Sequence, residues 1–416
     1  MKNPPEGWRR VLLGDLGSFK NGLNKEKEGF GHGLPFVNLM DVFGRSFLDE
    51  SRFGLVNSTV AEQLSYSLKR GDVLFVRSSV KPEGVGLTTV VVKDLPQTTY
   101  SGFLIRYRSD GSIVASFKAH CFSSEPFRRE LLRRSTISAN TNINQEELNQ
   151  LPLMLPGKDE QEGISAILSE WDKGVGVLAD VVGAKRELKL GLMQRLLTGQ
   201  TRFKGFVRST QQVKTRYGGF PVDWAAAHIG DIADEVSEKN GGGHALPVLS
   251  CTKHRGLVNS LEYFGKRVFS ADTSSYKVVR RGDFAYATNH VEEGSIGYQS
   301  LHDAALISPM YTVFRTRAAV YHSFFFKLVK TELYRHIFEV NTSGSIARRG
   351  GLRWDEFALI KVFLPSMPEQ IRIAAVLETC DREIELLQKQ LEALREQKRG
   401  LMQKLLTGEV RVKVKG

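Results

Sequence analysis

Four polar loops hold the side chains of this sequence that are best suited to recognition chemistry. Two of them, "VRSSVKPEG" (76–84) and "ATNHVEEG" (287–294), each follow a Gly-Asp pair and a short apolar run. The other two, "STISANTNINQ" (135–145) and "NTSGSIARRGGLRW" (341–354), each come shortly before a Leu-Pro pair. Their serine, threonine, asparagine, histidine and arginine side chains are the types that hydrogen-bond to base edges and phosphates. The loops therefore predict contacts with a nucleic acid.

A polar loop taken alone is more often only solvated, and that is the alternative interpretation of these four segments. Comparable loops at matching places in both halves of a basic chain favour the binding interpretation. The predicted DNA-binding residues are Arg77, Ser78, Ser79, Lys81, Asn140, Asn142, Asn144, Thr288, Asn289, His290, Ser343, Ser345, Arg348, Arg349 and Arg353.

The overall charge points to the same class of partner. The 416-residue chain carries a formal net charge of +12, and its pI is near 9.5. A positive excess of this size favours a polyanion, most often a nucleic acid. Charge alone does not decide the matter, because a merely soluble basic protein would have the same composition.

Motifs for catalysis and for metal binding are missing from the sequence. There is no GxxxxGK[ST] phosphate loop, no HExxH and no CxxC pair, and the cysteines Cys121, Cys251 and Cys380 lie far apart. The "NPPE" stretch at 3–6 lacks the aromatic residue of the adenine methyltransferase motif that it resembles. We therefore predict a chain that is not an enzyme and that holds neither a metal nor a cofactor. Two rival hypotheses stay open, a stand-alone nuclease or methyltransferase and a coiled-coil adaptor that does not touch DNA.

The hydrophobic pattern predicts no membrane span. No run of about 18 apolar residues occurs, and the sequence opens on the polar, proline-broken "MKNPPEGWRR". We expect a cytoplasmic protein.

One phrase of the sequence occurs twice. "GLMQRLLTGQTRF" (191–203) returns as "GLMQKLLTGEVRV" (400–412), and the same separation relates "LPGKDEQEGISAIL" (155–168) to "LPSMPEQIRIAAVL" (364–377). A repeat of this length without a gap indicates an internal duplication of a domain.

The duplication also reaches upstream, but the match is weaker there. "GWRRVLLGDLG" matches "DWAAAHIGDIA", and "LKRGDVLFVRSS" matches "VRRGDFAYATNH". Aligning "FLIRYRS" with "TVFRTRA" pairs Arg106 with Arg315 and Arg108 with Arg317. Each half thus combines a region that has diverged with a shorter one that has not.

The preserved regions have the pattern of long helices. Apolar residues alternate in steps of four and three from Ile164 to Leu196 and from Ile373 to Leu405, which is a heptad seam. Gly199 and Gly408 stand where a left-handed residue ends a helix. Ser366, with Glu369 three residues later, fits a capping box at the start of the second helix.

Two features of the seams need an explanation. Lys185, Lys189 and Lys398 occupy seam positions, where they either extend to solvent at a frayed end or meet a partner chain. The first helix also has Gly174, Gly176 and Gly183 where the second has glutamates. We expect the first helix to be the weaker one, because an interior glycine costs about 1 kcal/mol relative to alanine.

Together these patterns predict an α+β protein. Two mixed α/β domains are joined by two long helices that pack as an antiparallel coiled coil, and a pseudo-two-fold axis relates the two copies of the repeat. The predicted organisation is a variable domain over 1–156, a conserved helix over 157–203, a linker over 204–220, a second variable domain over 221–365, a second helix over 366–408 and a basic tail over 409–416.

The sequence resembles the specificity (S) subunits of type I restriction–modification systems. The resemblance extends over essentially the whole chain: a variable domain, an "LP…EQ" stretch and a long helix ending in "LMQ[RK]LLTG", and then all of these again. It implies that each variable domain is a target recognition domain that reads one half of a split site in double-stranded DNA. Because the two domains have diverged far, we expect an asymmetric site.

The resemblance also implies partners. The helices would space the half-sites and dock two modification subunits, which methylate adenine with S-adenosylmethionine. Restriction subunits would use ATP and Mg²⁺ to translocate and cut DNA, while this chain is itself not catalytic and binds no cofactor. For docking we favour the helix ends, with simple packing inside the chain as the alternative. The predicted partner-binding residues are Leu192, Met193, Leu196, Leu197, Leu401, Met402, Leu405 and Leu406.

Overall fold

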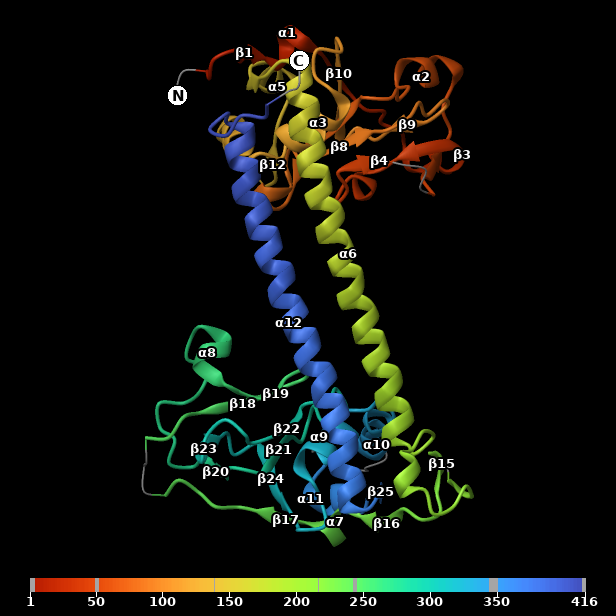
Figure 1. Ribbon diagram of the computed structural model, residues 1–416, viewed down its shortest axis with the longest axis vertical. Coiled ribbons are helices and arrows are strands. Elements are labelled where there is room, and N and C mark those ends of the chain that lie inside the picture. Colours follow the sequence, from red (N-terminus) through yellow and green to blue (C-terminus); the bar gives the residue numbers. More distant parts are fainter. Residues whose placement is uncertain are drawn as a thin grey trace. The chain divides into compact units, whose positions relative to one another are not determined.

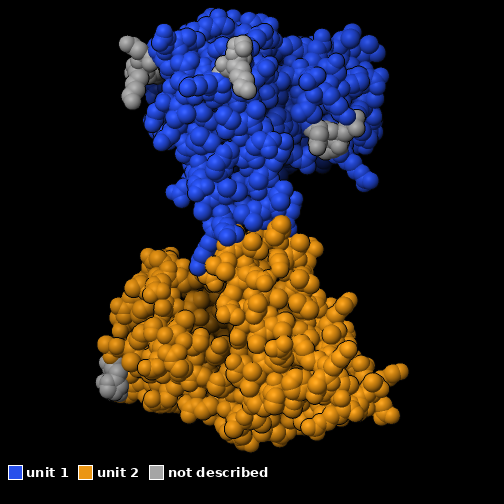
Figure 2. Space-filling view, in the orientation of Figure 1, with its two compact units in different colours: residues 1–180, 389–416 blue, residues 181–388 orange. Residues whose placement is uncertain are grey.

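The chain folds into two compact units that each combine one variable domain with parts of both long helices. In a computed structural model, the first unit comprises Met1–Asp180 and Lys389–Gly416, and the second comprises Val181–Gln388 (Figures 1 and 2). The structure describes residues 4–48, 52–137, 139–215, 217–241, 245–343 and 351–413. The helices are thus not units of their own: α6 (Lys158–Leu197) and α12 (Met367–Leu406) are each divided between the two.

The first unit is a mixed α/β domain. Its central sheet has the strand order β2-β10-β6-β8-β4, and its smaller sheets are β5-β3-β9, β11-β12-β7 and β1-β13. Besides α6 and the end of α12, the elements are β1 (Arg9–Leu12), α1 (Leu13–Leu16), β2 (Gly17–Asn21), η1 (Lys27–Gly29), β3 (Phe30–Val37), η2 (Leu39–Asp41), β4 (Phe47–Leu48), β5 (Gly54–Val56), α2 (Val60–Ser65), β6 (Val73–Val76), β7 (Ser78–Ser79), η3 (Pro82–Gly84), β8 (Thr88–Val91), β9 (Thr99–Tyr100), β10 (Leu104–Ser109), α3 (Ala115–Cys121), α4 (Glu125–Arg134), β11 (Thr136–Ile137), β12 (Thr141–Asn142), α5 (Gln145–Asn149) and β13 (Pro152–Leu155).

The second unit has a related sheet. Its central strands run in the order β17-β24-β21-β22, with the two-stranded sheets β14-β15, β16-β25, β18-β19 and β20-β23 around them. Its elements are η4 (Lys204–Phe206), β14 (Gln212–Thr215), β15 (Gly218–Pro221), β16 (Ala225–His228), α7 (Ile229–Ile232), β17 (Ala233–Val236), β18 (Leu249–Thr252), β19 (Gly256–Asn259), α8 (Ser260–Phe264), β20 (Lys277–Arg280), β21 (Phe284–Ala287), β22 (Ile296–Tyr298), β23 (Ala304–Ile307), β24 (Tyr311–Thr316), α9 (His322–Val329), α10 (Glu332–Ser343), α11 (Trp354–Ala358) and β25 (Lys361–Leu364). The segment expected to be a linker contains the hairpin β14-β15.

Strand register corrects the alignment of the two halves. In the first unit Tyr107 lies opposite Val73, the residue after Asp72. In the second unit Phe314 lies opposite Phe284, the residue after Asp283. Arg108 therefore occupies the place of Arg315, and the pairing of Arg108 with Arg317 expected from the sequence is wrong by two residues.

The seam residues form the least exposed stripe of each helix, and the helix ends complete the cores of the units. Leu405 and Leu406 join Ile164 and Leu168 in the core of the first unit. In the second unit the equivalent cluster contains Leu196, Leu197, Ile373 and Leu377. Burying a leucine side chain contributes about 1.5–3 kcal/mol, so the ends of the helices stabilise the domains themselves.

This burial corrects the predicted partner-binding set. Leu196, Leu197, Leu405 and Leu406 are all less than 9% exposed. Leu192, Met193, Leu401 and Met402 are partly buried against the same cores. The first four side chains are inaccessible to another protein while the domain is folded.

An ion pair joins the tail of one helix to the start of the other, with the same hydrogen bonds in both units. In the second unit, Arg202 donates from Nε and Nη2 to the carboxylate oxygens of Glu369 at 2.8 and 2.9 Å. In the first unit, Arg411 donates from the same atoms to Glu160 at 2.7 and 2.9 Å. We call each of these pairs a helix clamp. Both oxygens of Glu369, which was expected from the sequence to form a capping box with Ser366, accept hydrogen bonds from Arg202.

The glutamine after each clamp glutamate holds a loop of the variable domain. Gln161 accepts from the backbone N–H of Val114 at 2.8 Å and donates to the carbonyl of Ser112 at 3.1 Å. Gln370 accepts from Tyr321 at 2.8 Å and donates to Ala319 at 3.0 Å. The repeated "EQ" pair therefore joins each helix both to the tail of the other helix and to a variable domain.

The glycine that ends each helix has to be a glycine. Gly199 and Gly408 both have φ of +71°, which confirms the predicted left-handed termination. A Cβ atom on Gly199 would lie 2.5 Å from Cγ of Pro221, and one on Gly408 would lie 2.5 Å from Cγ of Pro5. A side chain at either position would meet both backbone strain and a steric clash.

The seam lysines pair with acids of the facing helix. Lys398 bonds Asp172 in the first unit. In the second unit, Lys185 bonds Glu383 at 2.8 Å, and Lys189 bonds Asp381. Residues further along α6 pair with residues earlier in α12, from Asp172 with Lys398 to Lys189 with Asp381. The helix segments within each unit therefore run antiparallel. These lysines therefore meet a partner inside the chain, which neither of the two interpretations anticipated.

Replacing two helix glycines should strengthen α6. Nothing lies within 4 Å of a Cβ placed on Gly176 or Gly183, so alanine fits at both positions without a clash. Each substitution, Gly176→Ala and Gly183→Ala, should stabilise the helix by about 1 kcal/mol and slow local amide exchange about 5-fold. Hydrogen exchange measured by mass spectrometry on α6 peptides tests this. Unchanged exchange in α6, or an equal change throughout α12, would contradict it.

The two clamps should differ in strength. The Arg202 side chain is 7% exposed and also bonds Asp223, whereas the Arg411 side chain is 43% exposed. Arg202→Met would leave buried carboxylates without a cation and should cost about 3 kcal/mol of unfolding free energy. Arg411→Met should cost less. Urea denaturation of both variants measures the difference, and equal losses would show that burial of the clamp does not set its contribution.

The clamp of the first unit should also weaken in acid. The hydrogen bonds from Arg411 lower the pKa of Glu160 below its ordinary value of 4.5. The ionised carboxylate therefore contributes stability above that ordinary value, and the contribution is lost as the pH falls through the lowered pKa.

Candidate nucleic-acid interface

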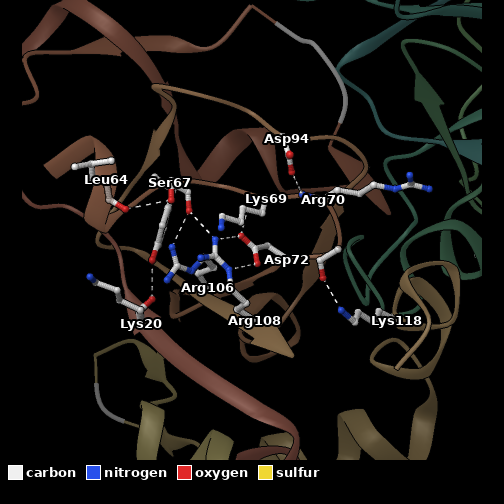
Figure 3. Close-up of polar contacts among 12 residues, drawn as sticks. Lys20, Leu64, Ser67, Lys69, Arg70, Asp72, Asp94, Arg106, Arg108 and Lys118 are labelled. Carbon is white, nitrogen blue, oxygen red and sulfur yellow. Dashed lines mark hydrogen bonds and ion pairs between the residues drawn. The ribbon is translucent and has the colours of Figure 1, made fainter. Parts of the chain in front are cut away.

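A buried aspartate anchors the strand that leads into each predicted reading loop. Asp72 precedes β6 and accepts two hydrogen bonds from Arg108, Nε to Oδ1 at 2.8 Å and Nη2 to Oδ2 at 2.6 Å (Figure 3). Asp283 precedes β21 and accepts the same two bonds from Arg315, at 2.6 and 3.1 Å. In both units these bonds raise the pKa of the arginine. The Gly-Asp pair of the sequence therefore fixes the position of its strand.

Further cations around Asp72 are engaged inside the first unit. Arg106 and Arg108 both donate to the carbonyl of Ser67, at 2.7 and 3.0 Å, and Lys118 donates to the carbonyl of Gly71 at 2.6 Å (Figure 3). Burial lowers the pKa of Lys118. These basic groups hold the framework, so the contacts with an outside anion fall to the loops beyond it.

In the first unit the fold brings the two predicted loops together. β7 pairs with β12, with Ser78 opposite Asn142 and Ser79 opposite Thr141. The N–H of Ile143 also donates to the carbonyl of Arg77 at 3.0 Å. Ser78, Ser79, Lys81 and Asn140 line one cavity. Loops that lie far apart in the sequence thus form a single surface.

Some predicted side chains of this surface already have local partners. The amide oxygen of Asn144 caps α5 by accepting from the N–H of Glu147 at 2.8 Å. Asn142 donates to the carbonyl of Asn140 at 3.0 Å, and Arg77 donates to that of Gly102 at 3.5 Å. Lys81 extends into solvent. The bond of Asn144 gives this residue a structural role that does not depend on a ligand.

The second unit joins its two loops in a similar way. The N–H of Leu352 donates to the carbonyl of Thr288 at 2.9 Å. A Cβ on Gly351 would lie 2.3 Å from that carbonyl oxygen and 2.4 Å from Oδ1 of Asn289, so the two loops are in direct contact. Arg353 is exposed at the start of α11.

The remaining predicted residues of this unit divide into two groups. Ser345, Arg348 and Arg349 lie outside the described residues. Ser343 is the last residue of α10, and His290 is exposed beside Glu293, whose Oε1 lies 3.3 Å from its Nδ1. The structure therefore brings Thr288 and Asn289 against the segment that begins at Gly351.

Sequence reasoning missed two exposed apolar side chains in these surfaces. Phe103 lines the cavity of the first unit together with Ser78 and Ser79. Met310 lines a cavity of the second unit together with Thr288 and Asn289. Both lie directly before an inner strand of a central sheet. The sequence pattern did not predict that these side chains are exposed, because a single apolar residue directly before a strand is expected to belong to the strand.

One group of side chains has the composition of a metal site. The ligand atoms of His290, Glu292 and Glu293 lie within 4.8 Å of one another. His290 and Glu293 are exposed on one turn and contact each other, which by itself explains their closeness.

Among the described helices, none is long and apolar enough to cross a membrane.

Comparison with known proteins finds similar specificity subunits. Residues 5–178 match the family model described as the type I restriction modification DNA specificity domain. The chain is 24% identical to the MjaX specificity subunit of a type I restriction enzyme from Methanocaldococcus jannaschii, over 98% of this chain and 95% of that protein. It is also 24% identical to the MjaVIII specificity subunit from the same organism, over 98% and 94%.

Solved structures show the same fold. The S subunit of a type I system from M. genitalium matches with a TM-score of 0.52 and 15% identity, over 97% of each chain. A chain from a study of complex assembly in the type I system matches with a TM-score of 0.58 and 15% identity, over 99% of this chain and 100% of that chain. The family model matches the first variable domain and part of α6, the relatives match nearly the whole chain, and the solved structures share its fold, so the chain is similar to type I restriction–modification specificity subunits.

Proposed function

We propose that this chain reads a split, asymmetric site in double-stranded DNA, with one half-site for each variable domain. The observation that supports the proposal is that the two units share one framework, but the loops on that framework present different side chains. Asp72 and Asp283 anchor equivalent strands with equivalent arginines. The loops that follow present Arg77, Ser78 and Ser79 in one unit but Thr288, Asn289 and His290 in the other. Different donors and acceptors on one framework would select different bases.

We propose that the chain itself is the non-catalytic member of such a complex, because it is similar to specificity subunits. We propose that two modification subunits methylate adenine within the site with S-adenosylmethionine. Restriction subunits would supply the chemistry that uses ATP and Mg²⁺. Because the proposed ligand is cellular and invading DNA, we place the complex in the cytoplasm.

Two identical modification subunits would bind to two equivalent surfaces, one in each half of the repeat. Leu196, Leu197, Leu405 and Leu406 at the helix ends are buried, so we look for the docking surface among the exposed apolar side chains of the helices. Val177 in α6 and Leu386 in α12 occupy equivalent positions of the repeat, and they are 64% and 61% exposed. Large apolar side chains exposed at matching places suit one partner bound in two copies. We propose that each of them contacts one modification subunit.

Co-expression with the neighbouring methyltransferase gene in a host without adenine methylation tests the reading function. Single-molecule sequencing should find N6-methyladenine within one bipartite, asymmetric motif. Replacing residues 221–365 with the matching domain of a relative should change one half of that motif and leave the other half intact. A purified complex that produces no methylated motif, or a swap that changes both halves, would contradict the proposal.

Substitution of the repeated apolar residues tests the docking surface. Val177→Asp or Leu386→Asp should each remove one modification subunit from the complex, and the double variant should remove both, because a carboxylate cannot be buried there without a partner. Native mass spectrometry gives the stoichiometry. Leu188→Asp is the matched control: Leu188 is 53% exposed on α6, but the repeat has a glutamine at its equivalent in α12. Loss of subunits in the control alone would place the docking surface elsewhere.

A further inference from the structure

A short turn before the inner strand of each central sheet has the same construction in both units. The N–H of Leu104 donates to the carbonyl of Ser101 at 2.8 Å, and that of Tyr311 donates to Ser308 at 3.1 Å. The serine hydroxyl accepts from the N–H two residues later, that of Phe103 at 3.3 Å in one unit. The same bond reaches Met310 at 3.5 Å in the other. Equivalent serines therefore fix equivalent turns.

Each turn displays one large apolar side chain. Phe103 is 59% exposed and Met310 is 69% exposed. The strand register that pairs Arg108 with Arg315 also pairs Phe103 with Met310, so the two residues occupy one position of the repeat. An isolated exposed apolar residue needs no explanation. Its recurrence on a turn with the same hydrogen bonds, in domains that have otherwise diverged, indicates a function.

Both side chains lie beside the proposed reading loops. The N–H of Arg77 donates to the carbonyl of Phe103 at 2.8 Å. In the other unit, Oγ1 of Thr288 lies 3.4 Å from the carbonyl oxygen of Met310. Phe103 shares a cavity lining with Ser78, Ser79 and Lys81, and Met310 shares one with Asn289 and His290. A duplex that contacts the polar loops would therefore also meet these apolar groups.

We propose that Phe103 and Met310 are specificity-determining residues that contact thymine. The inference rests on the proposed function, because it requires that these loops face DNA. In the major groove the apolar group on a base edge is the C5-methyl of thymine, and apolar side chains read it by direct contact. Basic and amide side chains around each residue would hold the phosphates and the other bases. Each half-site then contains a thymine that is read through its methyl group.

The test removes the methyl group from the DNA and the side chain from the protein. The complex of this chain with its modification subunits is titrated with duplexes in which one thymine at a time in the methylated motif is replaced by deoxyuridine. One replacement in each half-site should weaken binding by the wild-type complex about 4-fold, which corresponds to one buried methyl group. Phe103→Ala should abolish the effect in one half-site only. Met310→Ala should abolish it in the other half-site only, so each variant is the control for the other.

The outcomes separate the two proposals. If the complex does not prefer its motif over random duplex, the proposed function fails. If it prefers the motif but no deoxyuridine weakens binding, or if both alanine variants keep the wild-type sensitivity, only the methyl contact is overturned. Equal weakening of motif and random duplex by Phe103→Ala would also overturn it, because the side chain would then contribute without discriminating between bases. A half-site without any thymine on either strand would do the same.

Discussion

The arrangement of each unit depends on the helix clamp. Arg202 with Glu369, and Arg411 with Glu160, tie the tail that leaves one long helix to the first turn of the other. A buried carboxylate is costly unless a cation and hydrogen bonds satisfy it. Glu369 and Glu160 are therefore stable only while the tail is in place. The glycine before each tail directs the chain back toward the domain, and the leucines before that glycine enter its core. These linked requirements explain why the phrase "LMQ[RK]LLTG" and the following arginine occur twice with so little change.

The same contacts allow the rest of each domain to vary. The clamp glutamate is followed by a glutamine that holds a loop of the variable domain through backbone atoms, as Gln161 does with Val114 and Ser112. Backbone N–H and C=O groups are present whatever the side chain is. The Asp72 and Asp283 anchors fix one strand per sheet, and the loops beyond those strands are not part of the frame. Substitutions in the loops therefore change the side chains that the loops present, but they do not change the contacts that hold the domain in place.

The sequence was informative where a physical constraint leaves a periodic or conformational mark. The heptad seam and the left-handed glycines were accessible from residue types and spacing, whereas the meeting of two distant polar loops at one surface became visible only in the fold. The register of the central strands was not accessible from the sequence either. Side chains of a strand alternate with a period of two, so shifting "FLIRYRS" against "TVFRTRA" by two residues keeps every residue on the same face. In the structure Arg108 therefore matches Arg315, although aligning it with Arg317 pairs two arginines instead of one.

Other errors had a similar origin. An apolar stripe shows that a helix packs against something, but it does not show whether the partner is the same chain. Leu196 and Leu405 were therefore predicted to bind another protein, with packing inside the chain as the alternative, and in the structure they belong to the cores of their own domains. The exposed turn residues escaped notice for the opposite reason. Phe103 and Met310 stand next to strands, where an apolar residue is expected to be inside, and only the fold reveals that they face outward.

The two clamps differ in the groups that surround the ion pair. In the first unit Nε1 of Trp8 donates to Glu160 at 2.9 Å, so the carboxylate receives an indole as well as a guanidinium. In the second unit Nε1 of Trp224 is buried without a hydrogen-bond partner, which costs about 1–3 kcal/mol. There the residue before the tryptophan is Asp223, which bonds Arg202 at 2.6 Å, whereas the first unit has Gly7. Asp223 thus adds a second carboxylate to the clamp whose tryptophan does not bond the glutamate. The same arginine–glutamate pair is therefore surrounded by different groups in the two units, which agrees with the different burial of Arg202 and Arg411.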